Sequence, residues 1–274
     1  MKIFLMRSSA GSAWENNMSY LDSHAHIFSE EFHDDFDAVL ERAEKADVER
    51  IMIITLKEEE AKKAIAFARK GPEHYQVATG IFVDEADTYT DDDFERFKAM
   101  ASRPEVTAVG EIGLDYHWYK DEENHNRQKE LFIRQIEFAR QINKPILVHS
   151  RDAAQDTFDI LKEHHVHGLI HCFSGTKEMA KEYTKLGYYI ALGGAVTFKN
   201  SRHAKEVAST IDAKYLLSET DCPYMAPEPV RGTRNEPCNI PYIVKVLAEC
   251  RNIPVEEMEQ IIDDNYTRFL KENA

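Results

Sequence analysis

The sequence has few of the features that mark secreted, membrane or zinc-finger proteins. It contains only four cysteines, and no two of them have zinc-finger spacing. No apolar run approaches the ~20 residues that a membrane span needs. The apolar start of "MKIFLMRSSAGSAWENN" is too short for the core of a secretory signal. We therefore expect reduced thiols, a cytoplasmic location and no membrane partner.

Basic residues are also scarce. The chain has 34 lysines and arginines against 49 aspartates and glutamates, which gives a formal net charge of −15. Contacts with phosphates dominate nonspecific affinity for nucleic acid, so a chain this acidic should not coat DNA or RNA nonspecifically. A nucleic-acid substrate would have to be held locally, with help from bound cations.

What remains is an ordinary globular composition, 43% hydrophobic and 30% charged. A length of 274 residues suits one large domain or two small ones, and length alone does not decide between them. Residues 1–17 carry little pattern, and we interpret them as an N-terminal extension outside the core. We expect the domain to occupy residues 18–274.

Short β-branched or apolar runs alternate with longer amphipathic segments such as 32–46 and 127–143. The change from period 2 to period 3.6 in each unit indicates parallel βα units. Eight units without a long linker predict a single α/β domain, a closed (β/α)8 TIM-type barrel, with an open doubly wound sheet as the alternative. The last ~25 residues should form one or two further helices. The expected strands are 20–27, 49–56, 75–82, 106–113, 145–150, 168–173, 188–194 and 215–220.

The first of these strands, in "YLDSHAHIF" (20–28), has polar residues where a buried strand needs apolar ones. Alternation places Asp22, His24 and His26 on one face, where polar groups without partners are costly. Similar residues end other strands, and in a barrel the carboxyl ends of the strands form the catalytic rim. Four histidines and two carboxylates are expected at this rim: His24, His26, Glu111, His149, His171 and Asp221.

Each of these side chains alone has an ordinary structural explanation, such as a hydrogen-bonded histidine or a carboxylate that caps a turn. Together they would repel and desolvate one another unless cations lay between them. Imidazole and carboxylate are standard ligands of divalent metals, and six ligands exceed one tetrahedral site. The set predicts two divalent metal ions that share a bridging carboxylate. Asp22, deeper on the same face, either orients the histidines or bonds to backbone.

The motifs that carry these residues resemble those of a known family. "LDSHAH", "VGEIGLDYH", "PILVHSRDA", "HCFSG" and "SETDCPY" occur in the order typical of the TatD family of metal-dependent hydrolases, within the amidohydrolase-like superfamily. The resemblance covers about residues 19–270. It implies a TIM-type barrel, a two-metal site and deoxyribonuclease activity, often as a 3′→5′ exonuclease.

The resemblance also implies a role for each candidate ligand. His24, His26 and Asp221 would bind a first metal, His149 and His171 would bind a second, and Glu111 would bridge the two. The identity of the metal stays open among Mg, Mn, Zn and Ni.

Two cations ~3.5–4 Å apart can activate a bridging water and neutralise the oxygens of a phosphoryl displacement. Glu111 and Asp221 are therefore the expected catalytic residues, and Asp221 is the candidate for accepting the proton of the nucleophile. Cys172 and Cys222 directly follow two of the ligands, and alternation should turn them towards the helices.

Phosphate also needs cationic donors. Arg151, Lys199, Arg231 and Arg234 lie on expected rim loops, and the first three are our candidates for binding substrate. Each could instead be a solvated loop charge. The aromatic residues of "DYHWYK" (115–120) could stack on nucleobases or close a hydrophobic lid.

A deoxyribonuclease that acts on DNA or another phosphodiester is the favoured function. The same metals could instead hydrolyse another ester or an amide, as in an aminoacyl-tRNA deacylase or a small-molecule amidohydrolase. Glu111 favours the nuclease, since many amidohydrolases have a carboxylated lysine in its place. A non-catalytic scaffold is least favoured, because a closed barrel gains nothing structurally from six ligands at its rim. No obligate protein partner is inferred.

Overall fold

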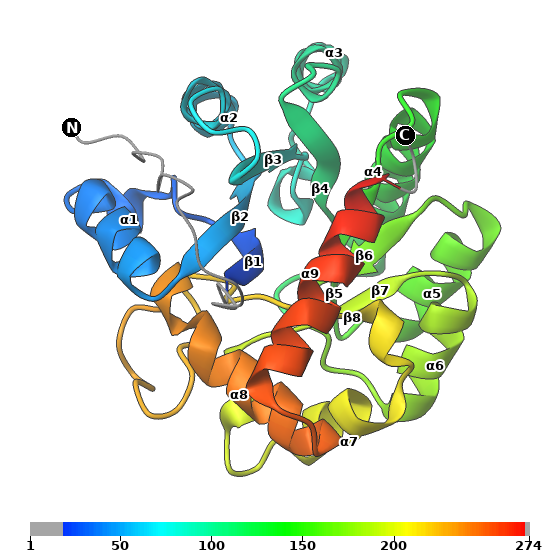
Figure 1. The fold of residues 1–274 in the computed structure, drawn as a ribbon. Coiled ribbons are helices and arrows are strands. Elements are labelled where there is room, and N and C mark those ends of the chain that lie inside the picture. The colour runs from blue at the N-terminus through cyan, green and yellow to red at the C-terminus, as the bar shows by residue number, and fades with distance from the viewer. Residues whose placement is uncertain (1–18, 272–274) are drawn as a thin grey trace.

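The structure, a computed structural model, describes residues 19–271 (Figure 1). These residues form an 8-stranded sheet in which each strand pairs with the next in the sequence, always in parallel. The expected N-terminal extension, residues 1–17, lies outside the described range. The strands are β1 (Tyr20–Ala25), β2 (Val48–Thr55), β3 (Tyr75–Thr79), β4 (Val106–Asp115), β5 (Ile146–Arg151), β6 (Gly168–Ile170), β7 (Tyr189–Leu192) and β8 (Leu216–Ser218).

Helices surround this sheet, and apolar side chains of strands and helices form one continuous buried core (Figure 1). Among residues 19–271, no helix is both long enough and apolar enough to cross a membrane. The α-helices of this range are α1 (Phe36–Lys45), α2 (Glu58–Ala68), α3 (Asp91–Ala101), α4 (Glu122–Gln141), α5 (Ala154–Glu163), α6 (Lys177–Lys185), α7 (Arg202–Thr210), α8 (Ile240–Arg251) and α9 (Val255–Lys271).

The last helix, α9, crosses the amino-terminal ends of several strands (Figure 1). The Tyr266 hydroxyl lies 3.0 Å from Gln76 Oε1 near the start of β3, and the Asn265 amide donates to the carbonyl of Leu216 at 2.8 Å, at the start of β8. This end of the barrel is therefore covered, and the opposite end, where the strands finish, remains for a functional site.

The sequence predicted this architecture. Each expected strand is present and overlaps its predicted range, and the last ~25 residues, where one or two helices were expected, hold α9. The (β/α)8 barrel is confirmed, and the open doubly wound sheet is not adopted. Strands β6 and β8 are shorter than predicted because the backbone leaves the ladder beyond them, where Cys172 and Asp221 have left-handed φ angles of 43° and 55°.

The barrel closes between β1 and β8 through both backbone and side-chain hydrogen bonds. An isolated parallel bridge joins Ala25 to Cys222. Below it, the Ser23 hydroxyl donates to the carbonyl of Ser218 at 2.9 Å, and the Ser218 hydroxyl donates to the carbonyl of Leu21 at 3.1 Å. Both serines are fully buried, so these bonds satisfy backbone carbonyls that a longer strand pairing would otherwise satisfy.

The buried hydroxyls of this seam should contribute to stability. We expect Ser23→Ala and Ser218→Ala each to lower the free energy of unfolding by about 1–3 kcal/mol, because each leaves a buried carbonyl without its donor. Urea denaturation of the metal-free protein measures this. The matched control is Ser102→Ala, which removes an exposed hydroxyl that donates to the carbonyl of Lys98, and it should change stability by less than about 0.5 kcal/mol. Equal effects of Ser218→Ala and Ser102→Ala would show that the seam does not depend on side chains.

Candidate metal centre

The six predicted ligands meet at the carboxyl ends of the strands. Three of them lie within strands β1, β4 and β5, and the others follow the ends of β1, β6 and β8 by one to three residues. Most are deeply buried: His24 is 0% exposed and Glu111 is 3% exposed. The side chains are His24, His26, Glu111, His149, His171 and Asp221.

The first cluster of donor atoms surrounds one oxygen of Glu111. His24 Nε2 and His26 Nε2 lie 3.2 Å apart, and they lie 3.3 and 3.4 Å from Glu111 Oε2. Asp221 Oδ1 lies 3.8 Å from His24 Nε2 and 3.5 Å from His26 Nε2. In a tetrahedral site with metal–ligand distances of ~2.1 Å, the ligand atoms lie about 3.4 Å from one another. These four atoms therefore have the spacing of a metal-ligand shell.

The second cluster surrounds the other oxygen of the same carboxylate. His149 Nδ1 and His171 Nε2 each lie 2.8 Å from Glu111 Oε1, and they lie 3.2 Å from each other. These three side chains form a further group that could hold a metal ion. The two oxygens of Glu111 thus face two different histidine pairs.

The protein alone leaves the charges and hydrogen bonds of this region unbalanced. In the first cluster, the ring nitrogens of His24 and His26 face each other, and two neutral imidazoles can form that contact only if one donates and the other accepts. Among the described residues, no lysine or arginine pairs with Glu111 or Asp221. A divalent cation accepts lone pairs from imidazole and carboxylate together. The residues present therefore fit a divalent cation.

The side chains of the site differ in whether their surroundings favour the charged form. Burial and the neighbouring His171 lower the pKa of His24 to about 4. Burial also disfavours the charged form of His26, but contacts with Asp221 and Glu111 raise its pKa to about 10. Although burial opposes it, the surrounding imidazoles hold the pKa of Glu111 well below its ordinary value. A bound metal would replace protons that the metal-free site retains.

Gly113, two positions after Glu111, lets β4 and β5 approach closely enough to bring Glu111 and His149 together. Gly113 has a φ of 148°, and a Cβ at this position would lie 1.9 Å from the carbonyl oxygen of His149. Gly113 and His149 are partners in the ladder between β4 and β5. Because only glycine fits there, the motif "VGEIG" brings the strand that carries Glu111 against the strand that carries His149.

Two further carboxylates lie beside the imidazoles, and our sequence analysis missed both. Asp115 Oδ2 lies 3.2 Å from His149 Nε2, and Glu219 Oε1 lies 3.9 Å from His171 Nδ1. Strand alternation could not have identified Glu219, because β8 ends at Ser218 and Asp221, two residues beyond Glu219, has a left-handed φ of 55°. Burial raises the pKa of Glu219 well above its ordinary value.

Asp22 does not contact an imidazole. Its Oδ1 accepts from the backbone N–H of His24 at 3.2 Å and from the backbone N–H of Thr220 at 2.9 Å, and its Oδ2 lies against the Thr220 hydroxyl. Of the two alternatives, the bond to backbone is therefore the one observed. Burial raises the pKa of Asp22 to about 7. This carboxyl ties β1 to the segment after β8 beneath the first cluster.

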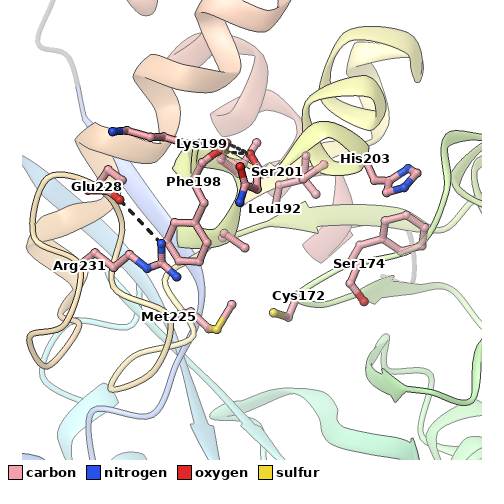
Figure 2. A pocket seen from close by; sticks show the side chains of 16 residues that line it. Cys172, Ser174, Leu192, Phe198, Lys199, Ser201, His203, Met225, Glu228 and Arg231 are labelled. Carbon is pink, nitrogen blue, oxygen red and sulfur yellow. Dashed lines mark hydrogen bonds and ion pairs between the residues drawn. The ribbon is translucent and has the colours of Figure 1, made fainter.

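A cleft of about 640 Å³ is lined by the segments that follow β6, β7 and β8 (Figure 2). Apolar side chains such as Leu192, Phe198 and Met225 line much of it. Its charged lining residues include Lys199, Arg231 and Glu228, and Arg231 Nη1 lies 3.9 Å from Glu228 Oε1. The Arg231 guanidinium lies 4.2 Å from the centre of the Phe198 ring. Two of the three predicted substrate-binding residues therefore lie at one cleft.

The two cysteines beside the ligands differ from each other. Cys222 is fully buried, as predicted. The prediction for Cys172 is wrong, because its side chain lines the cleft instead of facing the helices (Figure 2). Alternation fails there since β6 ends at Ile170 and Cys172 has a φ of 43°.

The remaining candidate cations lie apart from this cleft. Arg151 is exposed at the end of β5, and its guanidinium lies 5.3 Å from the centre of the Trp118 ring, which is 69% exposed. Arg234 is bound by two carboxylates, Asp35 at 2.7 Å and Glu236 at 2.8 Å. Arg234 therefore anchors the segment after β8, whereas Arg151 remains a candidate for binding substrate.

Comparisons with known proteins identify the family of this chain. A family described as TatD related DNase matches residues 21–271. YabD of Bacillus subtilis, described as an uncharacterized metal-dependent hydrolase, is 38% identical over 255 residues, which span 92% of this chain and 99% of YabD. TatD of Cronobacter sakazakii, described as a 3'-5' ssDNA/RNA exonuclease, is 31% identical over 256 residues, which span 90% of this chain and 96% of that protein.

A solved structure gives the same result for the fold. The crystal structure of YjjV, a TatD homolog from Escherichia coli, superposes with a TM-score of 0.84 at 28% identity, and the match covers 93% of this chain and 98% of YjjV. The matched family region includes both donor clusters. This chain belongs to the TatD-related DNase family and is a metal-dependent hydrolase.

Proposed function

We propose that the protein is a deoxyribonuclease that hydrolyses phosphodiester bonds with two divalent cations, one in each donor cluster. The observation that carries this proposal is that the two carboxylate oxygens of Glu111 face different pairs of histidines. Oε2 faces His24 and His26, and Oε1 faces His149 and His171. A carboxylate shared in this way suits a pair of cations that act on one phosphate. The relative described as a 3'-5' ssDNA/RNA exonuclease supports this substrate class. It also supports degradation of the strand in the 3'-5' direction.

Each side chain would have a defined role in this reaction. His24, His26 and Asp221 would hold one cation, His149 and His171 would hold the other, and Glu111 would contact both. Bound divalent cations would supply an activated water and would neutralise charge on the phosphate. The Asp221 side chain is 14% exposed, against 4% for Glu111. Asp221, the more exposed of the two carboxylates, would accept the proton of the attacking water.

The surroundings of the centre favour a phosphodiester over an uncharged ester or amide. Lys199 and Arg231 at the cleft, and Arg151 beside Trp118, would offer cations to phosphates of a bound strand. The apolar side chains of the cleft suit a nucleobase, and the exposed Trp118 ring offers a stacking surface. A small uncharged substrate would need none of these cations.

Hydrolysis assays with several substrates test the proposal. The purified protein should degrade single-stranded DNA when Mg, Mn, Zn or Ni is added and should lose this activity with a chelator. An aminoacyl-tRNA ester and a set of small amides and lactones serve as the competing substrates. Metal-dependent cleavage of an ester or amide, without cleavage of DNA, would overturn the proposed substrate class while leaving the metal centre in place.

Glu111→Gln should affect both cations at once. The amide keeps the shape, but it loses the charge, and its nitrogen carries donors in place of lone pairs. We expect metal content to fall from two ions per chain towards one or none, and turnover to fall by at least about a thousandfold, because several kcal/mol of charge stabilisation is lost. Elemental analysis and initial rates measure these effects beside His149→Ala and Asp221→Asn. Two retained metals with substantial activity in Glu111→Gln would show that this carboxylate is no bridge.

The salt dependence of DNA cleavage should be shallow. With three cations near the phosphates, the slope of log(kcat/KM) against log[salt] should be about −2 for a single strand, at ~0.7 per contact. Arg231→Gln and Lys199→Gln should each raise KM and reduce the slope by about 0.7, with little effect on kcat. The control is Lys63→Gln on the outer helix α2, which should change neither value. A slope as steep as that of a basic nuclease would mean that other cations bind the substrate.

A further inference from the structure

A second group of buried polar atoms lies behind the imidazoles. The rings of His24 and His171 are stacked, with centroids 3.9 Å apart and 10° between their planes. The Nε2 atom of each ring faces Glu111, which leaves Nδ1 as the second nitrogen of each. One nitrogen of each ring and one oxygen of Glu219 lie within 4.8 Å of one another. The stacked pair therefore lies between two carboxylates, Glu111 and Glu219.

The atoms on the Glu219 side lack partners. His24 Nδ1, His171 Nδ1 and Glu219 Oε2 are all buried, and none has a hydrogen-bond partner among the described residues. The other oxygen of Glu219 accepts the backbone N–H of Cys172. A buried polar atom without a partner destabilises the folded protein. His171 Nδ1 lies 3.9 Å from Glu219 Oε1, too far for a direct hydrogen bond. Two ring N–H donors and one carboxylate acceptor are complementary, and one water between them would satisfy all three.

The proton position in each ring follows from this arrangement. A neutral imidazole carries one N–H, and the other nitrogen keeps the lone pair that binds a metal. If Glu219 accepts from Nδ1 of both His24 and His171, both rings present the lone pair of Nε2 towards Glu111, where the cations are proposed to lie. Histidines that bind metals usually donate their other N–H to a carboxylate or carbonyl in this way.

We infer that Glu219 is a positioning residue shared by both cation sites, which holds one histidine of each site in the tautomer and orientation that binds metal. This inference rests on the proposed pair of cations. Asp115 provides the contrast, because its Oδ2 lies 3.2 Å from Nε2 of His149 and so acts on one histidine of one site. Loss of Glu219 should weaken the binding of both cations, and loss of Asp115 should weaken the binding of one.

A cation between His24, His171 and Glu219 is the competing interpretation, because these side chains also form a group of metal-ligand type. The position of the ring protons disfavours this interpretation. A ring that gives Nε2 to one cation keeps its proton on Nδ1, and it could bind a second cation only as an imidazolate. The metal stoichiometry of the wild-type protein distinguishes the two interpretations.

Calorimetric titration of the metal-free protein with Mn²⁺ tests the inference. Glu219→Gln keeps the volume of the side chain but places an NH₂ group against a ring N–H. We expect it to raise both dissociation constants about 10–100-fold, with two ions still bound at saturation. Asp115→Asn should raise one constant and leave the other unchanged. The matched control is Glu259→Gln on α9, which alters a buried glutamate outside both donor clusters and should change neither constant.

Nitrogen-15 NMR of the histidine rings provides a readout that does not depend on metal number or on the folding of a variant. In the metal-free wild-type protein, His24 and His171 should be in the Nδ1–H tautomer when they are neutral, and Glu219→Gln should mix the tautomers of both. The inference is overturned by an Nε2–H tautomer in either ring of the wild type. It is also overturned by a third Mn²⁺ ion that Glu219→Gln removes, or by a change in only one dissociation constant. A wild-type protein that binds a single ion would contradict the proposed pair of cations, and the tautomers would still test Glu219.

Discussion

A buried carboxylate among imidazoles is the constraint on which the rest of this structure depends. Glu111 is 3% exposed, and its two oxygens lie 2.8–3.4 Å from nitrogens of four histidines. A lone carboxyl in such a place would take up a proton, whereas these rings keep its pKa low. They can do so only while positive charge remains between them. In the metal-free protein the raised pKa values of His26 and His149, about 10 and about 9, keep positive charge beside Glu111, and a bound divalent cation would supply more.

The barrel meets this constraint by bringing the ends of several strands to one point. The contacts that close the barrel lie at the same place. The backbone N–H of Asp221 donates to the carbonyl of His24 at 2.9 Å, and the N–H of His26 donates to the carbonyl of Cys222 at 3.0 Å. These bonds join the end of β1 to the segment after β8 at the level of the first cluster. The contact that closes the barrel therefore also sets the distance between ligands from its first and last strands.

The fold and the ligands could be predicted from the sequence because both leave local signals. Alternation and helical periodicity locate the eight strands, and histidine or carboxylate at the end of a buried strand is conspicuous among apolar neighbours. What alternation could not give was the backbone beyond each strand end. Cys172 turns into the cleft because of its left-handed φ, and Asp22 bonds to backbone across the seam. The contacts of Asp115 and Glu219 depend on which nitrogen of each ring faces Glu111, which no sequence pattern specifies.

The arginines at the rim differ in whether carboxylates already pair with them. Arg234 and Arg42 are both held by Asp35 and Glu236, so this network anchors the segment after β8. Arg231, on that segment, lies on the Phe198 ring beside the cleft. In a chain with a net charge of −15, such cations are few, and a polyanion is repelled by most of the surface. Attraction for the phosphodiester proposed as substrate would then come mainly from the centre, where each bound divalent cation would add two positive charges, and Lys199, Arg231 and Arg151 would add contacts to phosphate. The metals would thus provide binding as well as chemistry.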